Sequence, residues 1–153
     1  MPTSGGKRRV VQDTPARLVL DTSAYSRFRA GDTRVHDLLS AAEIVLVPAI
    51  VLGELYGAFE FGSRGRENRV TLQEFLAEPF VRTVAISPDV ARQYGRVYSA
   101  LRRAGTPIPV NDMWIAATAL DQGACVLTFD TDFKRVLGLD RIILEGIEPG
   151  AEE

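Results

Sequence analysis

The chain has 153 residues, of which 46% are hydrophobic and 25% charged, and its formal net charge at pH 7 is −2. This length and composition predict one globular domain that buries roughly two-thirds of its unfolded surface. No apolar run approaches the roughly 18 residues of a membrane-spanning helix, and the single cysteine, Cys125, excludes an intramolecular disulfide, so we expect a protein of the reducing cytoplasm with no membrane partner.

Short apolar runs alternate with helical patterns along the chain. The polar segment 1–16 is predicted to be a flexible tail, 17–147 the folded domain and 148–153 a second tail. Because strands alternate with helices, we expect a three-layer α/β/α sandwich with a mainly parallel sheet. Strands are predicted at 17–21, 44–47, 81–86, 125–129 and 141–144, and helices at 22–28, 32–42, 48–62, 66–78, 88–104, 112–122 and 131–138.

Two acids stand where predicted strands end. Asp21 follows the run RLVL, and Asp130 follows CVLTF. Ligands of parallel sheets collect at the carboxyl ends of the strands, so both side chains are candidates for a functional site. Taken singly, each acid is better explained as a helix or turn cap, since Asp is favoured in both places.

Glu54 is the only charged residue between Ile44 and Phe59. An unpaired ionised carboxylate in such surroundings would cost several kcal/mol, so Glu54 is expected to be exposed, protonated, paired or bound to a cation. The sequence favours neither a site residue nor a partly exposed surface acid.

A further acid, Asp112, heads the predicted helix that contains the run IAATAL. If Asn111 is the N-cap, Asp112 is the first helical residue, and Val110 and Ile115 occupy the positions of a hydrophobic staple. The positive end of the helix would then stabilise its charge by roughly 0.3–1 kcal/mol. A capping role and a site role are therefore compatible.

Four converging carboxylates would repel one another unless a cation neutralised them. Oxygen ligands without a cysteine or histidine cluster favour Mg²⁺ or Mn²⁺ over zinc. Such an ion can activate water, so no histidine base is required. The only histidine, His36, is expected on the surface of an early helix.

The acids lie in three segments: LVLDTSAYSRF, IVLVPAIVLGELYGA and PIPVNDMWIAATALDQGACVLTFDTDFKRVLGL. Together these segments resemble the PIN-domain ribonucleases, and in particular the VapC-type toxins of bacterial toxin–antitoxin pairs, over roughly 17–145. The resemblance implies metal-dependent cleavage of RNA, usually tRNA or rRNA, inhibition by a small VapB-type antitoxin, and a homodimer.

The resemblance also implies roles for individual residues. Asp21, Glu54, Asp112 and Asp130 are the implied catalytic acids, and Asp132 is a further metal-ligand candidate, because family members differ over which acid of the last motif faces the metal. The implied metal ligands are Asp21, Asp112, Asp130 and Asp132. Ser23, Asn111 and Thr128 are expected to orient these carboxylates from behind.

Two alternatives remain open at this point. A phosphatase of the haloacid-dehalogenase type also places an Asp after its first strand, but it requires a second Asp two residues later, where this chain has Ser23. A regulatory protein could instead keep the acids for folding and bind RNA or an antitoxin without cutting. Metal-dependent RNA cleavage by the purified chain would distinguish the nuclease from both.

Overall fold

The computed structural model describes residues 14–146, which form one five-stranded parallel sheet in the order β3-β2-β1-β4-β5. Every predicted strand is present, and every neighbouring pair is parallel. The predicted tail 148–153 and most of the predicted tail 1–16 lie outside the described residues. The strands are β1 (Arg17–Leu20), β2 (Ile44–Pro48), β3 (Val81–Val84), β4 (Cys125–Thr128) and β5 (Arg141–Ile143).

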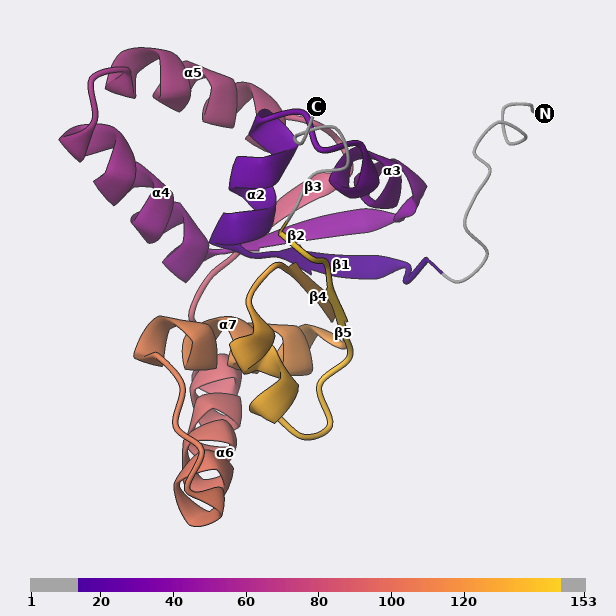
Figure 1. Ribbon diagram of the computed structural model, residues 1–153, viewed down its shortest axis with the longest axis vertical. Coiled ribbons are helices and arrows are strands. Elements are labelled where there is room, and N and C mark those ends of the chain that lie inside the picture. Colours follow the sequence, from indigo (N-terminus) through magenta and orange to yellow (C-terminus); the bar gives the residue numbers. More distant parts are fainter. Residues whose placement is uncertain (1–13, 147–153) are drawn as a thin grey trace.

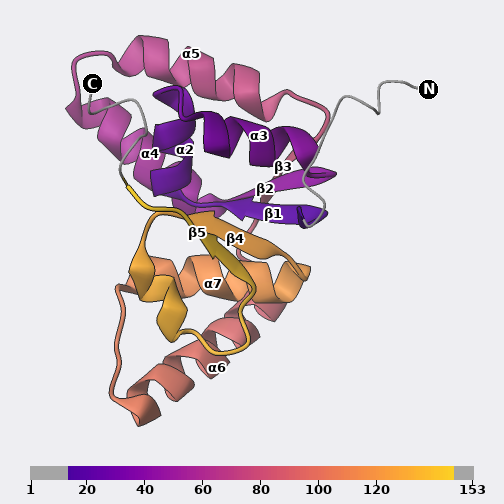
Figure 2. The same cartoon turned by 45° about the vertical axis from the view of Figure 1, so that its right-hand side comes forward.

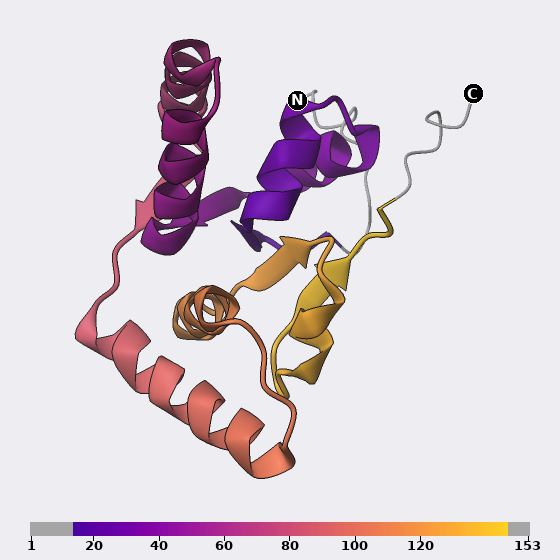
Figure 3. The ribbon, with the colours of Figure 1, turned by 60° about the vertical axis from the view of Figure 1, so that its left-hand side comes forward.

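Helices cover both faces of the sheet, which confirms the predicted three-layer α/β/α sandwich (Figures 1 and 2). One face carries α2 (Thr22–Arg29), α3 (Thr33–Ala41), α4 (Ala49–Phe61) and α5 (Gly65–Leu76). The opposite face carries α6 (Pro88–Ala104), α7 (Val110–Gln122) and the 3₁₀ helix η1 (Thr131–Arg135). Figure 3 shows α7 between the sheet and α6, so α6 is the outermost helix of its layer.

The topology explains why the helices divide in this way. From β1 the chain moves to β2 and then to β3 in one direction along the sheet. The connection that leaves β3 then runs back past β2 and β1 to β4. Parallel crossovers are almost always right-handed, so reversing the direction moves the connecting helices to the opposite face. The connections that leave β1 and β4 therefore diverge, which opens a crevice at the carboxyl ends of these two neighbouring strands.

The strands are apolar because both faces of the sheet are covered. Leu18, Val19 and Leu20 of β1 are fully buried, as are Val126 and Leu127 of β4. These two strands pair directly, with Leu18 opposite Cys125. The central strands thus fix the positions of the acids that follow them.

Helix α6 begins and ends where predicted. Ser87 caps the helix by accepting from the backbone N–H of Val90, and Gly105 ends it with φ +71°. Tyr98 of this helix is 42% exposed. Because α6 reaches the sheet only through α7, its buried stripe is narrow and consists of Val90, Val97 and Leu101.

Helix α7 begins earlier than predicted, at Val110. Its N-cap is Pro109, whose carbonyl accepts from the backbone N–H groups of Asp112 (3.1 Å) and Met113 (3.2 Å). The predicted N-cap role of Asn111 and the predicted hydrophobic staple are therefore wrong, since Asn111 already lies in the first turn. No helix within residues 14–146 is both long and apolar enough to cross a membrane.

Candidate metal centre

The site begins at Asp21, the first residue after β1. It is 4% exposed and caps α2 by accepting from the backbone N–H of Ala24 at 2.9 Å. Its Oδ1 also accepts from Ser23 Oγ (2.8 Å), and its Oδ2 accepts from Thr128 Oγ1 (2.5 Å). The capping interpretation is thus correct for Asp21, but it accounts for only one of three hydrogen bonds.

The hydroxyls of Ser23 and Thr128 join Asp21 to the chain that follows β4. Ser23 Oγ accepts from the backbone N–H of Phe129 (3.0 Å), and Thr128 Oγ1 accepts from the backbone N–H of Asp130 (2.9 Å). Each hydroxyl therefore donates to the carboxylate of Asp21 while accepting from the backbone beside Asp130. This network locks the carboxyl ends of β1 and β4 together.

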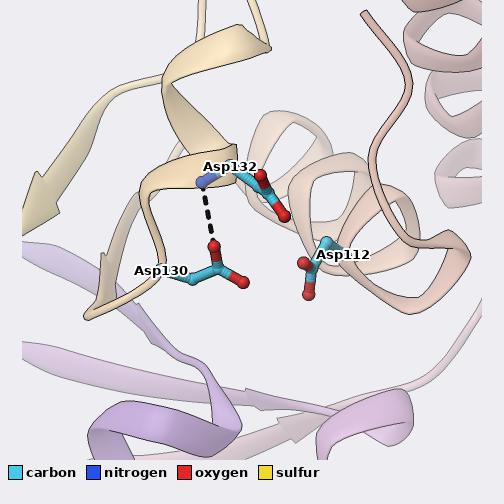
Figure 4. A group of neighbouring side chains, drawn as sticks. All are labelled: Asp112, Asp130 and Asp132. Carbon is cyan, nitrogen blue, oxygen red and sulfur yellow. Dashed lines mark hydrogen bonds between the residues drawn. The ribbon is translucent and has the colours of Figure 1, made fainter.

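Three acids from two elements face one another beside this network (Figure 4). Asp112 comes from the first turn of α7, and Asp130 and Asp132 come from the start of η1. One carboxylate oxygen from each lies within 4.8 Å of the other two, and all three side chains are half-buried. Asp130 Oδ1 also accepts from the backbone N–H of Asp132 (2.9 Å), which fixes the turn between the two acids.

The acids are close enough to perturb one another. The pKa of Asp112 is raised to about 7, first by burial, then by the charge of Asp130 and a hydrogen bond shared with it, and then by the charges of Asp21 and Glu54. Burial also raises the pKa of Asp21, against the lowering effect of its hydrogen bonds. The carboxylates therefore form one electrostatic cluster centred on Asp112.

Glu54 lies at the edge of this cluster, on α4. Thr22 Oγ1 donates to its Oε1, and Asn111 Nδ2 donates to its Oε2 at 2.9 Å. Of the four states left open by the sequence, Glu54 thus occupies the paired one. The amide of Asn111 contacts Glu54 rather than capping its own helix.

Two contacts of the cluster were not foreseen from the sequence. Thr22 holds Glu54, and Arg135 Nη1 lies 3.5 Å from Asp132 Oδ1 while donating to the carbonyl of Pro107 (2.9 Å). The spacing of three residues between Asp132 and Arg135 is a signal for a helical ion pair. The bond from Thr22 leaves no such local signal, because its partner is 32 residues away.

The sequence that builds this site matches a known family. A model of the PIN domain matches residues 18–139, well over half of the chain. The chain therefore belongs to the PIN-domain family.

Similar proteins of known sequence narrow the class further. Ribonuclease VapC5 of Mycobacterium tuberculosis is 32% identical over 127 residues, which cover 82% of this chain and 91% of the relative. Ribonuclease VapC4 of the same organism is 35% identical over 119 residues, which cover 76% of this chain and 88% of the relative. The resemblance to VapC-type PIN domains is thereby confirmed, and the family match does not support the haloacid-dehalogenase alternative.

Solved structures agree with this assignment. The structure of VapBC-5 from Mycobacterium tuberculosis, a member of the VapBC family of toxin–antitoxin systems, aligns with a TM-score of 0.67 and 28% identity. The alignment covers 86% of this chain and 100% of that chain. The whole described fold, rather than a single motif, is thus shared.

Proposed function

We propose that this chain is a metal-dependent endoribonuclease toxin that hydrolyses phosphodiester bonds in tRNA or rRNA. The observation that carries the proposal is the close grouping of Asp112, Asp130 and Asp132, in which burial and then the charge of Asp130 raise the pKa of Asp112 to about 7. Such a cluster is unfavourable by itself and becomes favourable when a cation joins it. The names of the VapC relatives support RNA as the substrate.

The donors fit a hard divalent cation. All three grouped ligands are carboxylate oxygens, which suit Mg²⁺ and also Mn²⁺. Asp112, Asp130 and Asp132 would hold the ion, and Asp21, whose oxygens accept three hydrogen bonds, would contribute its charge from the floor of the site. A bound divalent ion supplies charge stabilisation at a phosphoryl oxygen and lowers the pKa of water.

The remaining polar residues position these acids. Ser23 and Thr128 fix Asp21 relative to Asp130, and Asn111 and Thr22 fix Glu54 relative to α7 and α2. Because each of these bonds joins two different elements, the carboxylates are held before any ligand binds. Such preorganisation reduces the rearrangement needed when charge develops at the phosphate.

The decisive test compares the wild-type chain with Asp112→Asn. Purified wild type should cleave tRNA or rRNA with Mg²⁺ or Mn²⁺ and lose activity in EDTA, whereas Asp112→Asn should be inactive. The variant removes a repelled charge, so its Tm without metal should equal or exceed that of the wild type. An active Asp112→Asn, or cleavage that persists in EDTA, would contradict the proposal, and RNA binding without cleavage by the wild type would support the silent regulator instead.

We further propose a VapB-type antitoxin partner and a homodimer. The VapBC-5 structure supports the antitoxin, and the exposed apolar side chains of the hairpin formed by α4 and α5 support a protein contact there. Phe61 is 95% exposed and Val70 is 53% exposed, while Phe75 is buried. A strict monomer in sedimentation at micromolar concentration would contradict the homodimer.

A further inference from the structure

A groove on the sheet face opposite α4 and α5 has no role in the site described above. It has a volume of about 540 Å³ and is bounded by α6, the end of α7 and η1. Its floor is apolar and includes Val97, Leu101 and Leu120, and Leu137 stands at its edge with 84% exposure. Such a surface is available to a ligand.

The volume of about 540 Å³ falls in the range of pockets that hold small organic ligands. The groove could therefore take a flat aromatic group such as a nucleobase.

The rim of the groove is cationic. Arg96 from α6 and Lys134 and Arg135 from η1 line it, and no acid lies among its lining residues. Within residues 14–146, Arg96 and Lys134 make no ion pair, so both charges face solvent beside the apolar floor. Apolar surface bordered by positive charge is complementary to a ligand that carries both an apolar face and a negative group.

The groove is connected to the acidic cluster through η1. Arg135 both lines the groove and contacts Asp132, and Lys134 lies two residues after that acid. The same short helix thus presents acids toward the cluster and cations toward the groove. A ligand that spans both regions would place a phosphate near the acids and the next part of its chain in the groove.

We propose that this groove binds a single-stranded segment of the RNA substrate next to the cleaved phosphate. This inference rests on the proposed ribonuclease function. A base lies against Leu120 and Leu137, and neighbouring phosphates contact Arg96 and Lys134. Bases splayed from single strands are held by apolar and stacking contacts, and phosphates by Lys and Arg, so the two surfaces of the groove match the two parts of a nucleotide.

The test compares two variants that remove equal charge. The double variant Arg96→Gln/Lys134→Gln alters the groove, whereas Arg92→Gln/Arg102→Gln alters α6 outside it. Binding of a short fluorescent RNA single strand is measured by anisotropy in the Asp112→Asn background at several salt concentrations. The groove variant should bind at least tenfold more weakly, and its salt slope should fall by about 1.4, since each phosphate contact on a single strand contributes about 0.7.

A third variant tests the groove without changing charge. Ala100 lines the groove on an exposed position of α6, so Ala100→Trp should fill it while leaving Tm nearly unchanged. In the otherwise wild-type enzyme, both groove variants should raise KM for RNA at least tenfold and leave kcat within about twofold. Loss of kcat with unchanged KM would overturn the proposal.

The outcomes separate this proposal from the proposed function. If the wild type cleaves RNA and the groove variants behave like the control pair, the groove proposal alone is overturned. If the wild type neither binds nor cleaves RNA, both are overturned. Unchanged RNA affinity combined with loss of inhibition by the antitoxin would assign the groove to a peptide and would also overturn the proposal.

Discussion

Thr128 offers the sharpest test of the network that joins β1 to β4. Its side chain is fully buried, and its hydroxyl donates to Asp21 while accepting from the backbone N–H of Asp130. Thr128→Val keeps the shape of the side chain but removes the hydroxyl. The change leaves one buried carboxylate oxygen and one partly buried N–H short of a partner.

The size of the effect follows from these two groups. Each unsatisfied buried group costs about 1–3 kcal/mol, and the added methyl group recovers a part, so the free energy of unfolding should fall by about 2–4 kcal/mol. For a chain of this length, that corresponds to a fall in Tm of roughly 5–15 °C. Because the bond from Thr128 lowers the pKa of Asp21, its loss should raise that pKa further and weaken metal binding.

Calorimetry and an RNA cleavage assay with Mg²⁺ would measure both effects. Thr128→Ser is the matched control, because it keeps the hydroxyl and loses only a methyl group. It should retain most of the activity and a Tm closer to that of the wild type. If Thr128→Val were as stable and as active as Thr128→Ser, the network would have no energetic role and our reasoning would be refuted.

Three further outcomes are expected. Because protons compete with metal for Asp112, Mn²⁺ affinity measured by calorimetry should rise as pH increases through about 7. The raised pKa of Asp112 stabilises the metal-free chain fully below pH 3.8, and this stability should be lost as pH rises from 3.8 to about 7. Asp112→Asn should show neither trend. Asn111→Ala should reduce the cleavage rate several-fold with little change in Tm, because its exposed amide donates one charge-assisted bond to Glu54; a rate equal to that of the wild type would speak against positioning. His36→Ala should leave the cleavage rate unchanged, because the exposed His36 lies on α3, away from the acids of the site. Without a histidine acid–base pair, cleavage should leave 5′-phosphate and 3′-hydroxyl ends, and 2′,3′-cyclic phosphate ends on sequencing would exclude this chemistry.

Local patterns in the sequence were sufficient for most of the fold. The strands were predicted because fully covered strands are continuously apolar, and Ser87 and Gly105 marked the ends of α6 through local backbone chemistry. The exposure of Tyr98 could not be predicted, because periodicity identifies the faces of a helix but not how much of each face a neighbour covers. Local signals therefore locate elements better than they locate contacts.

The candidate site shows the same limit. Asp21 and Asp130 could be located because both directly follow apolar strands, and parallel strands bring their carboxyl ends together. The partner of Asn111 could not be predicted, because a cap and a bond to Glu54 require the same residue type at the same position. Only the placement of α4 beside α7 decides between them.

The order in which the acids occur along the chain has a consequence for synthesis of the protein on the ribosome. Asp21 is made early, whereas Asp130 and Asp132 belong to the final part of the described chain, and the strand that brings them beside Asp21 is inserted next to β1 only after the long return from β3. A chain made only as far as β3 therefore lacks Asp112, Asp130 and Asp132. If the cluster is the catalytic centre, a growing chain stays harmless to nearby RNA until β4 and η1 have been made.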